Sequence, residues 1–196
     1  MQITWEMFMM DISVLKEKSD SLNDGWEIKG DPSQVGLAYL FKTLKKPLKP
    51  SMPLSCCQEL EDASLELKQL DFASKSASNS SEMVVFEYHI LYSLSYGVPV
   101  LYFNAWKSDG SLLEIEKVWD LASSPYKDAV KESKWGAVSQ QDHPIIGKPY
   151  FFFHPCNTAR LLEDVCSGDP KSNRVLAWLS LVAPLVGLSI PYKFAK

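Results

Sequence analysis

The sequence predicts an α+β fold, in which one antiparallel meander sheet carries helices packed on one face. Three observations favour this class. Apolar residues recur at helical spacing near the N-terminus, alternating patterns typical of strands fill the middle of the chain, and helical spacing returns toward the C-terminus. The chain has 196 residues, of which 46% are hydrophobic, so it can bury one substantial core. We therefore expect a single domain over residues 1–196.

The first predicted element is a helix over residues 4–18. Phe8, Ile12 and Leu15 share one face at this spacing. Thr4 is a candidate N-cap, because its hydroxyl can accept a hydrogen bond from an unpaired amide of the first turn.

Four strands are predicted next, over residues 26–29, 35–43, 83–93 and 100–107. The third has the clearest alternation, which places its side chains in two sets on opposite faces of the sheet. One set is Val84, Phe86, Tyr88, Ile90 and Tyr92, and the other is Val85, Glu87, His89, Leu91 and Ser93.

The segment between the second and third strands, from about residue 45 to residue 82, has a different composition. Pro47, Pro50 and Pro53 recur every three residues, and residues 74–81 are rich in serine. We expect a mobile insertion within the domain, because the part of the chain that precedes it is too small to fold alone.

The C-terminal half is predicted to contain a helix over residues 112–122, then a strand that follows His143-Pro144 and ends at His154. Helices over residues 158–165 and 171–183 complete the order.

The charge balance and the apolar stretches bear on the kinds of partner that we expect. The formal net charge is −4, and the Lys and Arg residues form no long run, which argues against nucleic acid as a partner. The longest apolar stretch, residues 175–188, is too short to cross a hydrocarbon layer of about 30 Å, so we expect a buried helix and no transmembrane segment.

The cysteine count and the absence of known cofactor motifs predict a protein with free thiols and without a cofactor. Residues 1–10 lack the pattern of a secretory signal, and four cysteines do not suggest a disulfide framework, so we expect a reducing, cytoplasmic setting. The sequence has no phosphate-binding glycine loop, dinucleotide fingerprint or zinc-helix motif. We therefore expect no cofactor and no metal.

The main candidate for chemistry is Cys156. An aromatic run typical of a buried strand ends at His154-Pro155, and Cys156 follows directly, just before a predicted helix start. The thiolate is the reactive form of cysteine, and a helix N-terminus favours it. Pro155 fixes the backbone before the thiol, while His154 is placed either to tune it or to pin the loop. A buried cysteine at the end of a core strand is the alternative, and the local sequence leaves both open.

Other cysteine chemistries have less support. A cysteine protease would need His89 or His143 to reach Cys156 as a base, and no local feature indicates this. Cys56-Cys57 lies in the insertion without further zinc ligands at suitable spacing. Cys166, at the end of a predicted helix, is expected to lie in the core or to be half-buried.

Four segments together resemble one family. They are residues 88–103, Gln140-Gln141-Asp142-His143-Pro144, His154-Pro155-Cys156 and residues 178–188. This set is similar to the autophagy conjugating enzymes, which carry ubiquitin-like proteins as thioesters, and within them to the branch of autophagy protein ten. The lipid-conjugating branch of autophagy protein three shares the His-Pro-Cys motif. The closing Trp-Leu-Ser segment and the compact length favour the former branch.

The resemblance implies an open variant of the ubiquitin-conjugating enzyme fold and a transferase activity. It implies that Cys156, with His154 beside it, accepts the ubiquitin-like autophagy protein twelve from autophagy activating enzyme seven. Cys156 would then transfer this cargo to a lysine of autophagy protein five. Two alternatives remain open: a non-catalytic module on the same fold, binding partners by strand addition along residues 83–93, and the lipid-conjugating sister enzyme.

One departure from the wider pattern concerns the oxyanion of the tetrahedral intermediate. Ordinary ubiquitin-conjugating enzymes place an asparagine upstream of their cysteine in a His-Pro-Asn motif, which is absent from this sequence. The candidates for this role are the backbone amides near Asn157 and Thr158 and the Asn157 side chain.

Overall fold

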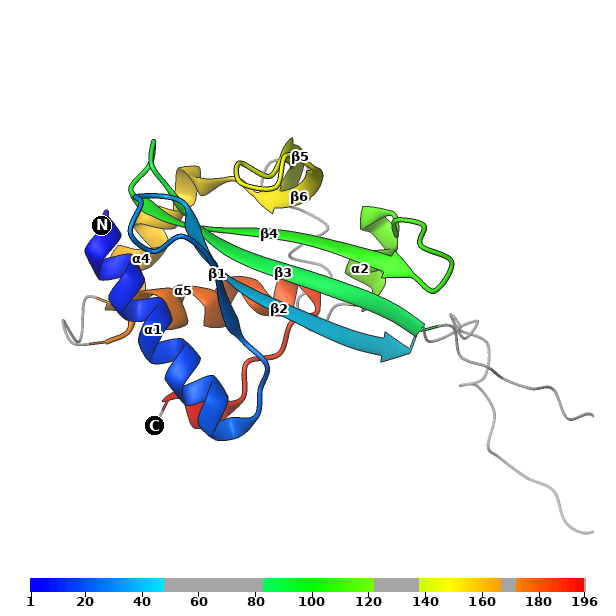
Figure 1. Ribbon diagram of the computed structural model, residues 1–196, viewed down its shortest axis with the longest axis horizontal. Helices are drawn as coiled ribbons and strands as arrows, with labels where there is room; N and C mark the ends of the chain where they lie inside the picture. Colours follow the sequence, from blue (N-terminus) through cyan, green and yellow to red (C-terminus); the bar gives the residue numbers. More distant parts are fainter. Residues whose placement is uncertain (48–82, 122–137, 167–171, 196) are drawn as a thin grey trace, which may run out of the picture.

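The computed structural model describes residues 1–47, 83–121, 138–166 and 172–195. Within these residues the strands form one six-stranded antiparallel sheet in the order β1-β2-β3-β4-β6-β5. Figure 1 shows helices α1, α4 and α5 gathered on one side of this sheet. The predicted α+β class, a meander sheet with helices on one face, is confirmed.

Helix α1, Trp5–Leu22, confirms the first predicted element and extends it by one turn. Thr4 is the N-cap, and its side chain accepts a hydrogen bond from the backbone N–H of Met7. Phe8, Ile12 and Leu15 are fully buried against the sheet and helix α5. The apolar stripe read from the sequence is therefore the face that packs into the core.

Successive side chains along each of the six strands point to opposite faces of the sheet. Their bounds are β1 Glu27–Gly30, β2 Ala38–Pro47, β3 Met83–Ser93, β4 Val98–Lys107, β5 Val138–Asp142 and β6 Pro149–Phe153. Strand β3 has the predicted bounds, and Phe86, Tyr88 and Ile90 are fully buried on the side of the helices. Leu91 belongs to a second apolar cluster on the opposite side, which we call the outer face.

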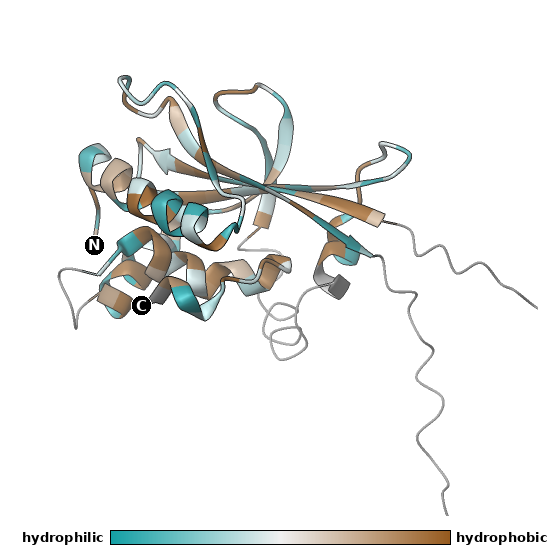
Figure 2. Ribbon diagram, turned by 60° about the horizontal axis from the view of Figure 1, so that its bottom comes forward, coloured by the Kyte–Doolittle hydropathy of each residue, from teal (hydrophilic) through white to brown (hydrophobic). Residues whose placement is uncertain are grey.

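The outer face is covered in part by the hairpin of β5 and β6. Strand β6 pairs with β4 only at Phe151 and Phe152, so this hairpin turns away from the rest of the sheet. Its side chains Tyr150 and Phe152 pack with Tyr39 and Tyr102 from the central strands. Figure 2 shows the contrast with the other face, where the helices lie together beneath the sheet.

The C-terminal helices close the main core. Their bounds are α2 Ile115–Leu121, α4 Thr158–Cys166 and α5 Arg174–Val182, with 3-10 turns η2 Pro155–Asn157, η3 Ala183–Val186 and η4 Tyr192–Ala195. Asn173 caps α5 through a hydrogen bond from the backbone N–H of Leu176, and Trp178 is buried. Among the residues that the structure describes, no helix has the length and apolar character that a bilayer crossing requires.

Three details of the sheet differ from the sequence prediction. The second strand was predicted to end at residue 43, whereas β2 continues to Pro47, which pairs with Met83. Cys56, Cys57 and the rest of residues 48–82 lie outside the described residues. Because both ends of this segment are paired in the sheet, we propose that it interrupts one domain rather than joining two.

Strand β5 was not predicted, since its sequence is mostly polar and exposed. Strand β3 is hydrogen-bonded to β2 on one side and to β4 on the other. Strand addition along β3 is therefore wrong as a binding mode, because neither edge of this strand is free.

Candidate active site

Cys156 lies on an exposed 3-10 turn that joins β6 to α4. His154 is extended, with φ −63° and ψ 129°, and its Nδ1 accepts a hydrogen bond of 3.2 Å from the backbone N–H of Cys156. Pro155 is buried, whereas Cys156 and Asn157 are exposed. The predicted placement, a thiol between a strand end and a helix start, is confirmed, and the alternative of a buried cysteine is wrong.

The local sequence explains why the turn is well defined. Pro155 has its φ fixed by its ring, which suits the first position of a helical turn. The His154 side chain acts as the cap of that turn, since it takes up an amide that has no partner inside the helix. Rings of Tyr96 and Phe152 flank the imidazole, with centroids 5.8 Å and 6.1 Å away. These contacts hold the segment that carries the thiol.

The hydrogen bonds of the turn leave fewer candidates for stabilising the oxyanion. The backbone N–H of Thr158 donates to the carbonyl of Pro155, and that of Cys156 donates to His154. Both amides are therefore engaged in holding the turn. The backbone N–H of Asn157 and its exposed side chain, next to Cys156, are the candidates that these hydrogen bonds leave.

The other two histidines are not brought to Cys156. His89 Nδ1 and His143 Nε2 lie 3.0 Å apart, and both side chains are almost fully buried on the outer face. Burial, together with the neighbouring His143 and Lys29, lowers the pKa of His89 to about 3. Burial lowers the pKa of His143 to about 4. The structure therefore gives no support to a cysteine protease arrangement.

Other predicted candidates are placed as follows. Cys166 is buried at the end of α4, as predicted. The described residues contain no group of three His, Cys, Asp or Glu side chains arranged to hold a metal ion. The pairing of His89 with His143 was missed, because the two lie 54 positions apart and only the fold brings them together.

Comparison with known proteins decides the family. A family model described as "Autophagocytosis associated protein, active-site domain" matches residues 7–193. The ubiquitin-like-conjugating enzyme ATG10 of Homo sapiens is 39% identical over 189 residues, which cover 91% of this chain and 86% of that protein.

The chain belongs to the ATG10 family.

More distant ATG10 proteins match shorter parts of the chain. The ATG10 of Arabidopsis thaliana is 36% identical over 118 residues, or 57% of this chain and 52% of that protein. The ATG10 of Dictyostelium discoideum is 32% identical over 127 residues, which cover 58% of this chain and 55% of that protein. The chain is thus an autophagy ubiquitin-like-conjugating enzyme, a transferase, and the non-catalytic alternative is set aside.

Proposed function

We propose that Cys156 is the residue of this ATG10 family member that carries the ubiquitin-like protein as a thioester. The observation that carries the proposal is the position of the thiol. It is exposed on a turn fixed by Pro155 and by the His154 hydrogen bond, so a whole protein can reach it without entering a pocket. The proposed setting is the cytoplasm, where a free thiol persists.

The proposed reaction has two transfers. The Cys156 thiolate attacks the thioester carbonyl of the C-terminal glycine of the cargo, held on the activating enzyme. A new carbon–sulfur bond forms, and the sulfur of the activating enzyme leaves as a thiolate. The amine of an acceptor lysine then attacks the same carbonyl, an isopeptide bond forms, and Cys156 leaves as the thiolate while the amine loses a proton.

His154 is proposed to act as a positioning residue. Its Nδ1 is occupied by the Cys156 amide, so the imidazole fixes the backbone that aims the sulfur. The Asn157 side chain is proposed to donate a hydrogen bond to the oxyanion that forms in each transfer, since preorganised donors at that position lower the barrier.

The proposed partners follow from the family resemblance. The cargo is the ubiquitin-like autophagy protein twelve, the donor is autophagy activating enzyme seven, and the acceptor is a lysine of autophagy protein five. The alternative is the lipid-conjugating reaction of the sister enzyme. The two reactions use different ubiquitin-like proteins, so the cargo that loads onto this chain distinguishes them.

A loading assay tests both the residue and the cargo. The purified chain is incubated with the activating enzyme, ATP and either of the two autophagy ubiquitin-like proteins, then analysed on a non-reducing gel. We expect a band sensitive to reductant with autophagy protein twelve. In Cys156→Ser this band should be lost or replaced by an ester that resists reductant.

Cys166→Ala is the matched control, because it removes the other described thiol, which is buried. This variant should load normally. A reductant-sensitive conjugate that survives in Cys156→Ser would overturn the assignment of Cys156. Loading of the other ubiquitin-like protein alone would overturn the assignment of the cargo.

A further inference from the structure

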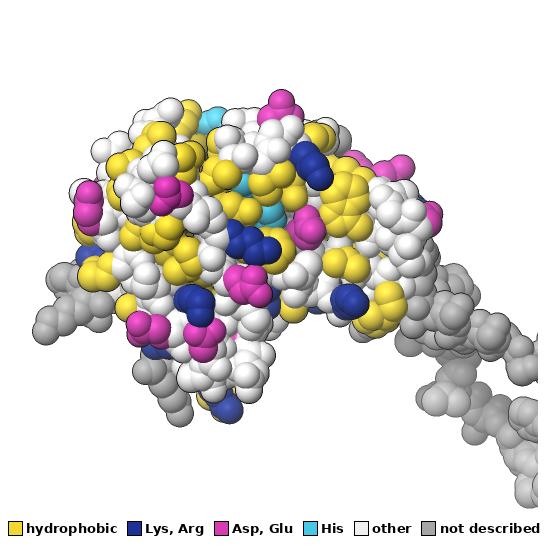
Figure 3. Space-filling view, in the orientation of Figure 1, with side chains coloured by type: hydrophobic (Ala, Val, Ile, Leu, Met, Phe, Trp, Pro, Cys, Tyr) yellow, Lys and Arg dark blue, Asp and Glu magenta, His cyan; other side chains and the backbone are white. Residues whose placement is uncertain are grey.

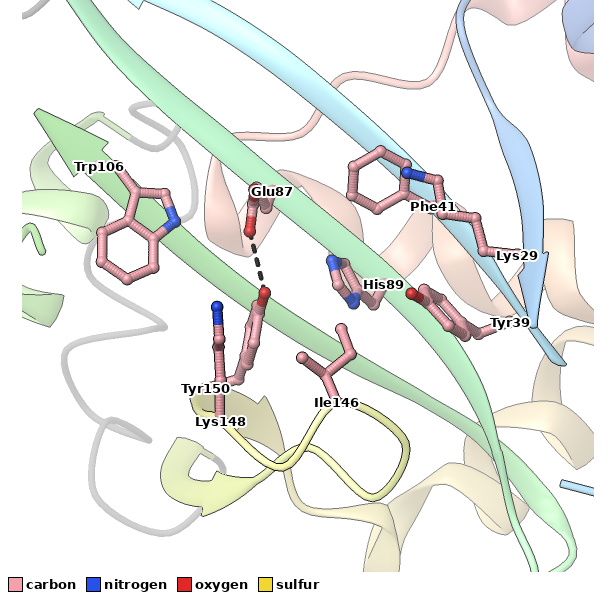
Figure 4. A pocket seen from close by; sticks show the side chains of 9 residues that line it. All are labelled: Lys29, Tyr39, Phe41, Glu87, His89, Trp106, Ile146, Lys148 and Tyr150. Carbon is pink, nitrogen blue, oxygen red and sulfur yellow. Dashed lines mark hydrogen bonds between the residues drawn. The ribbon is translucent and has the colours of Figure 1, made fainter. Parts of the chain in front are cut away.

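A hollow of about 500 Å³ lies on the outer face of the sheet, between the central strands and the turn of the β5–β6 hairpin. The lining is mixed: His89 and Glu87 come from β3, Tyr39 from β2, and Ile146, Lys148 and Tyr150 from the hairpin. Figure 3 shows hydrophobic side chains in the middle of this face of the molecule, with lysine and acidic side chains among them. Figure 4 shows the His89 ring surrounded by Tyr39, Tyr150 and Ile146.

Hydrogen bonds fix where the two buried histidines carry their protons. The backbone N–H groups of Ile145 and Ile146 both donate to Nδ1 of His143, each at 3.2 Å. This nitrogen must therefore be an unprotonated acceptor, and the ring proton lies on Nε2. Nε2 of His143 then donates to Nδ1 of His89, at 3.0 Å. The one ring proton of neutral His89 is left on its Nε2.

Nε2 of His89 is a buried donor without an acceptor. The side chain is only 1% exposed, and this nitrogen has no hydrogen-bond partner among the residues that the structure describes. Leaving a buried donor unpaired is unfavourable, because the group has lost its hydrogen bonds to water without gaining one in the protein. Because His89 lines the hollow, a ligand that brings an acceptor there recovers this cost.

The charges around the hollow favour an anionic acceptor. Lys29 and Lys148 contribute two ammonium groups to the lining. Lys29 lies over the ring of Phe41, with Nζ 3.4 Å from the centroid. The Glu87 carboxylate is partly satisfied, because Oε2 accepts a hydrogen bond of 2.9 Å from the hydroxyl of Tyr150. Lys29 Nζ also lies 3.8 Å from Oε2 of Glu27, a pair that is weak because both side chains are exposed and that lies outside the lining. Within the lining itself, two cations and one unpaired donor face a single carboxylate, Glu87, which is already hydrogen-bonded.

We propose that this hollow binds the carboxylate of an aspartate or glutamate side chain on an acidic peptide segment of a partner protein. Nε2 of His89 donates to one carboxylate oxygen, and Lys29 or Lys148 pairs with the negative charge. The aromatic walls pack against the stem of the ligand side chain and its apolar neighbours. The proposal does not depend on Cys156, because its test measures binding rather than transfer.

NMR of the full chain with ¹⁵N-labelled histidine tests the proposal. The buried imidazole N–H of His89 is a direct reporter of its partner. The probes are acetyl-Leu-Glu-Leu-amide, its twin acetyl-Leu-Gln-Leu-amide, and free glutarate, each titrated to about 10 mM, which detects even millimolar affinity. We expect the Glu peptide to shift the His89 Nε2–H resonance in a saturable way, and more strongly than either of the other probes.

Substitutions of Lys148 test whether a positive charge beside the hollow contributes to binding. Lys148 is exposed on the hairpin turn, so its replacement should leave the fold intact. Lys148→Gln should weaken binding of the Glu peptide about fivefold, and Lys148→Arg should restore it. Lys45→Gln is the matched control, because Lys45 is an exposed cation on β2 that does not line the hollow. It should bind normally.

Three outcomes would overturn the proposal. The first is no shift of the His89 resonance with the Glu peptide. The second is an equal shift with the Gln twin, which would show that the hollow does not recognise charge. The third is tighter binding of glutarate than of the Glu peptide, which would show a small-molecule site.

Discussion

His154 and the pair of His89 and His143 occupy different parts of the molecule and differ in exposure and in partners. His154 is exposed at the end of β6, and its hydrogen bond reaches only two residues along the chain. His89 and His143 are buried under the β5–β6 hairpin and bond to each other across the fold.

We infer from this difference that the turn at His154 serves transfer, whereas the buried pair of His89 and His143 serves the stability of the fold. A turn set by local sequence can present a thiol to another protein, and changes there should affect transfer more than folding. A buried polar pair is costly to disturb, because each broken hydrogen bond leaves a desolvated group behind. The predictions below test this separation.

Among the substitutions, the largest expected effect on folding comes from His143→Ala. The change removes the acceptor of two backbone amides and the donor to His89, and it leaves a void in a fully buried site. We expect the free energy of unfolding to fall by about 3 kcal/mol, measured by urea denaturation. His154→Ala, as the control, should lower it by no more than about 1 kcal/mol. Equal losses in the two variants would contradict the comparison.

The second prediction concerns acid. His89 and His143 have pKa values lowered to about 3 and about 4 in the folded protein, whereas an unfolded histidine titrates near 6.5. Between these values the unfolded state binds more protons, so stability falls as the pH drops from 6.5 toward 4. The expected slope is up to about 1.4 kcal/mol per pH unit for each histidine.

Urea denaturation at several pH values measures this slope. His154→Asn retains both buried histidines and should keep it. A free energy of unfolding that stays constant between pH 6.5 and 5 would show that the pair is not held neutral by burial.

The smallest expected effect concerns the turn itself. His154→Ala removes the acceptor of the Cys156 amide, and we expect transfer to the acceptor protein to slow about fivefold, which corresponds to loss of one cap of about 1 kcal/mol. His154→Asn can still accept from an amide two residues on, so it should recover most of this rate. A single-turnover chase, in which the loaded enzyme is mixed with the acceptor, measures this transfer rate. Equal losses in both variants would indicate that the imidazole acts on the chemistry rather than on the backbone.

The features that could be predicted from the sequence depend on neighbouring residues. Helix α1 follows from Thr4 and the spacing of Phe8, Ile12 and Leu15, and β3 follows from its strict alternation. The turn at Cys156 is also local, since Pro155 fixes one residue and His154 caps the next.

The features that were missed depend on contacts between distant segments. Strand β5 carries few apolar residues, so only its pairing with β6 makes it a strand. The extension of β2 to Pro47 comes from pairing with Met83. The His89–His143 pair exists only because the hairpin returns over the outer face, and no pattern within either segment indicates it.

The central claim, that Cys156 carries the cargo, is tested most directly by mapping the thioester. The loaded chain is digested without reductant, and mass spectrometry locates the peptide that bears the C-terminal glycine of the ubiquitin-like protein. We predict that this remnant lies on the peptide containing Cys156 and is released by hydroxylamine. A remnant on the peptide containing Cys166 or Cys56-Cys57, with Cys156 unmodified, would contradict the account.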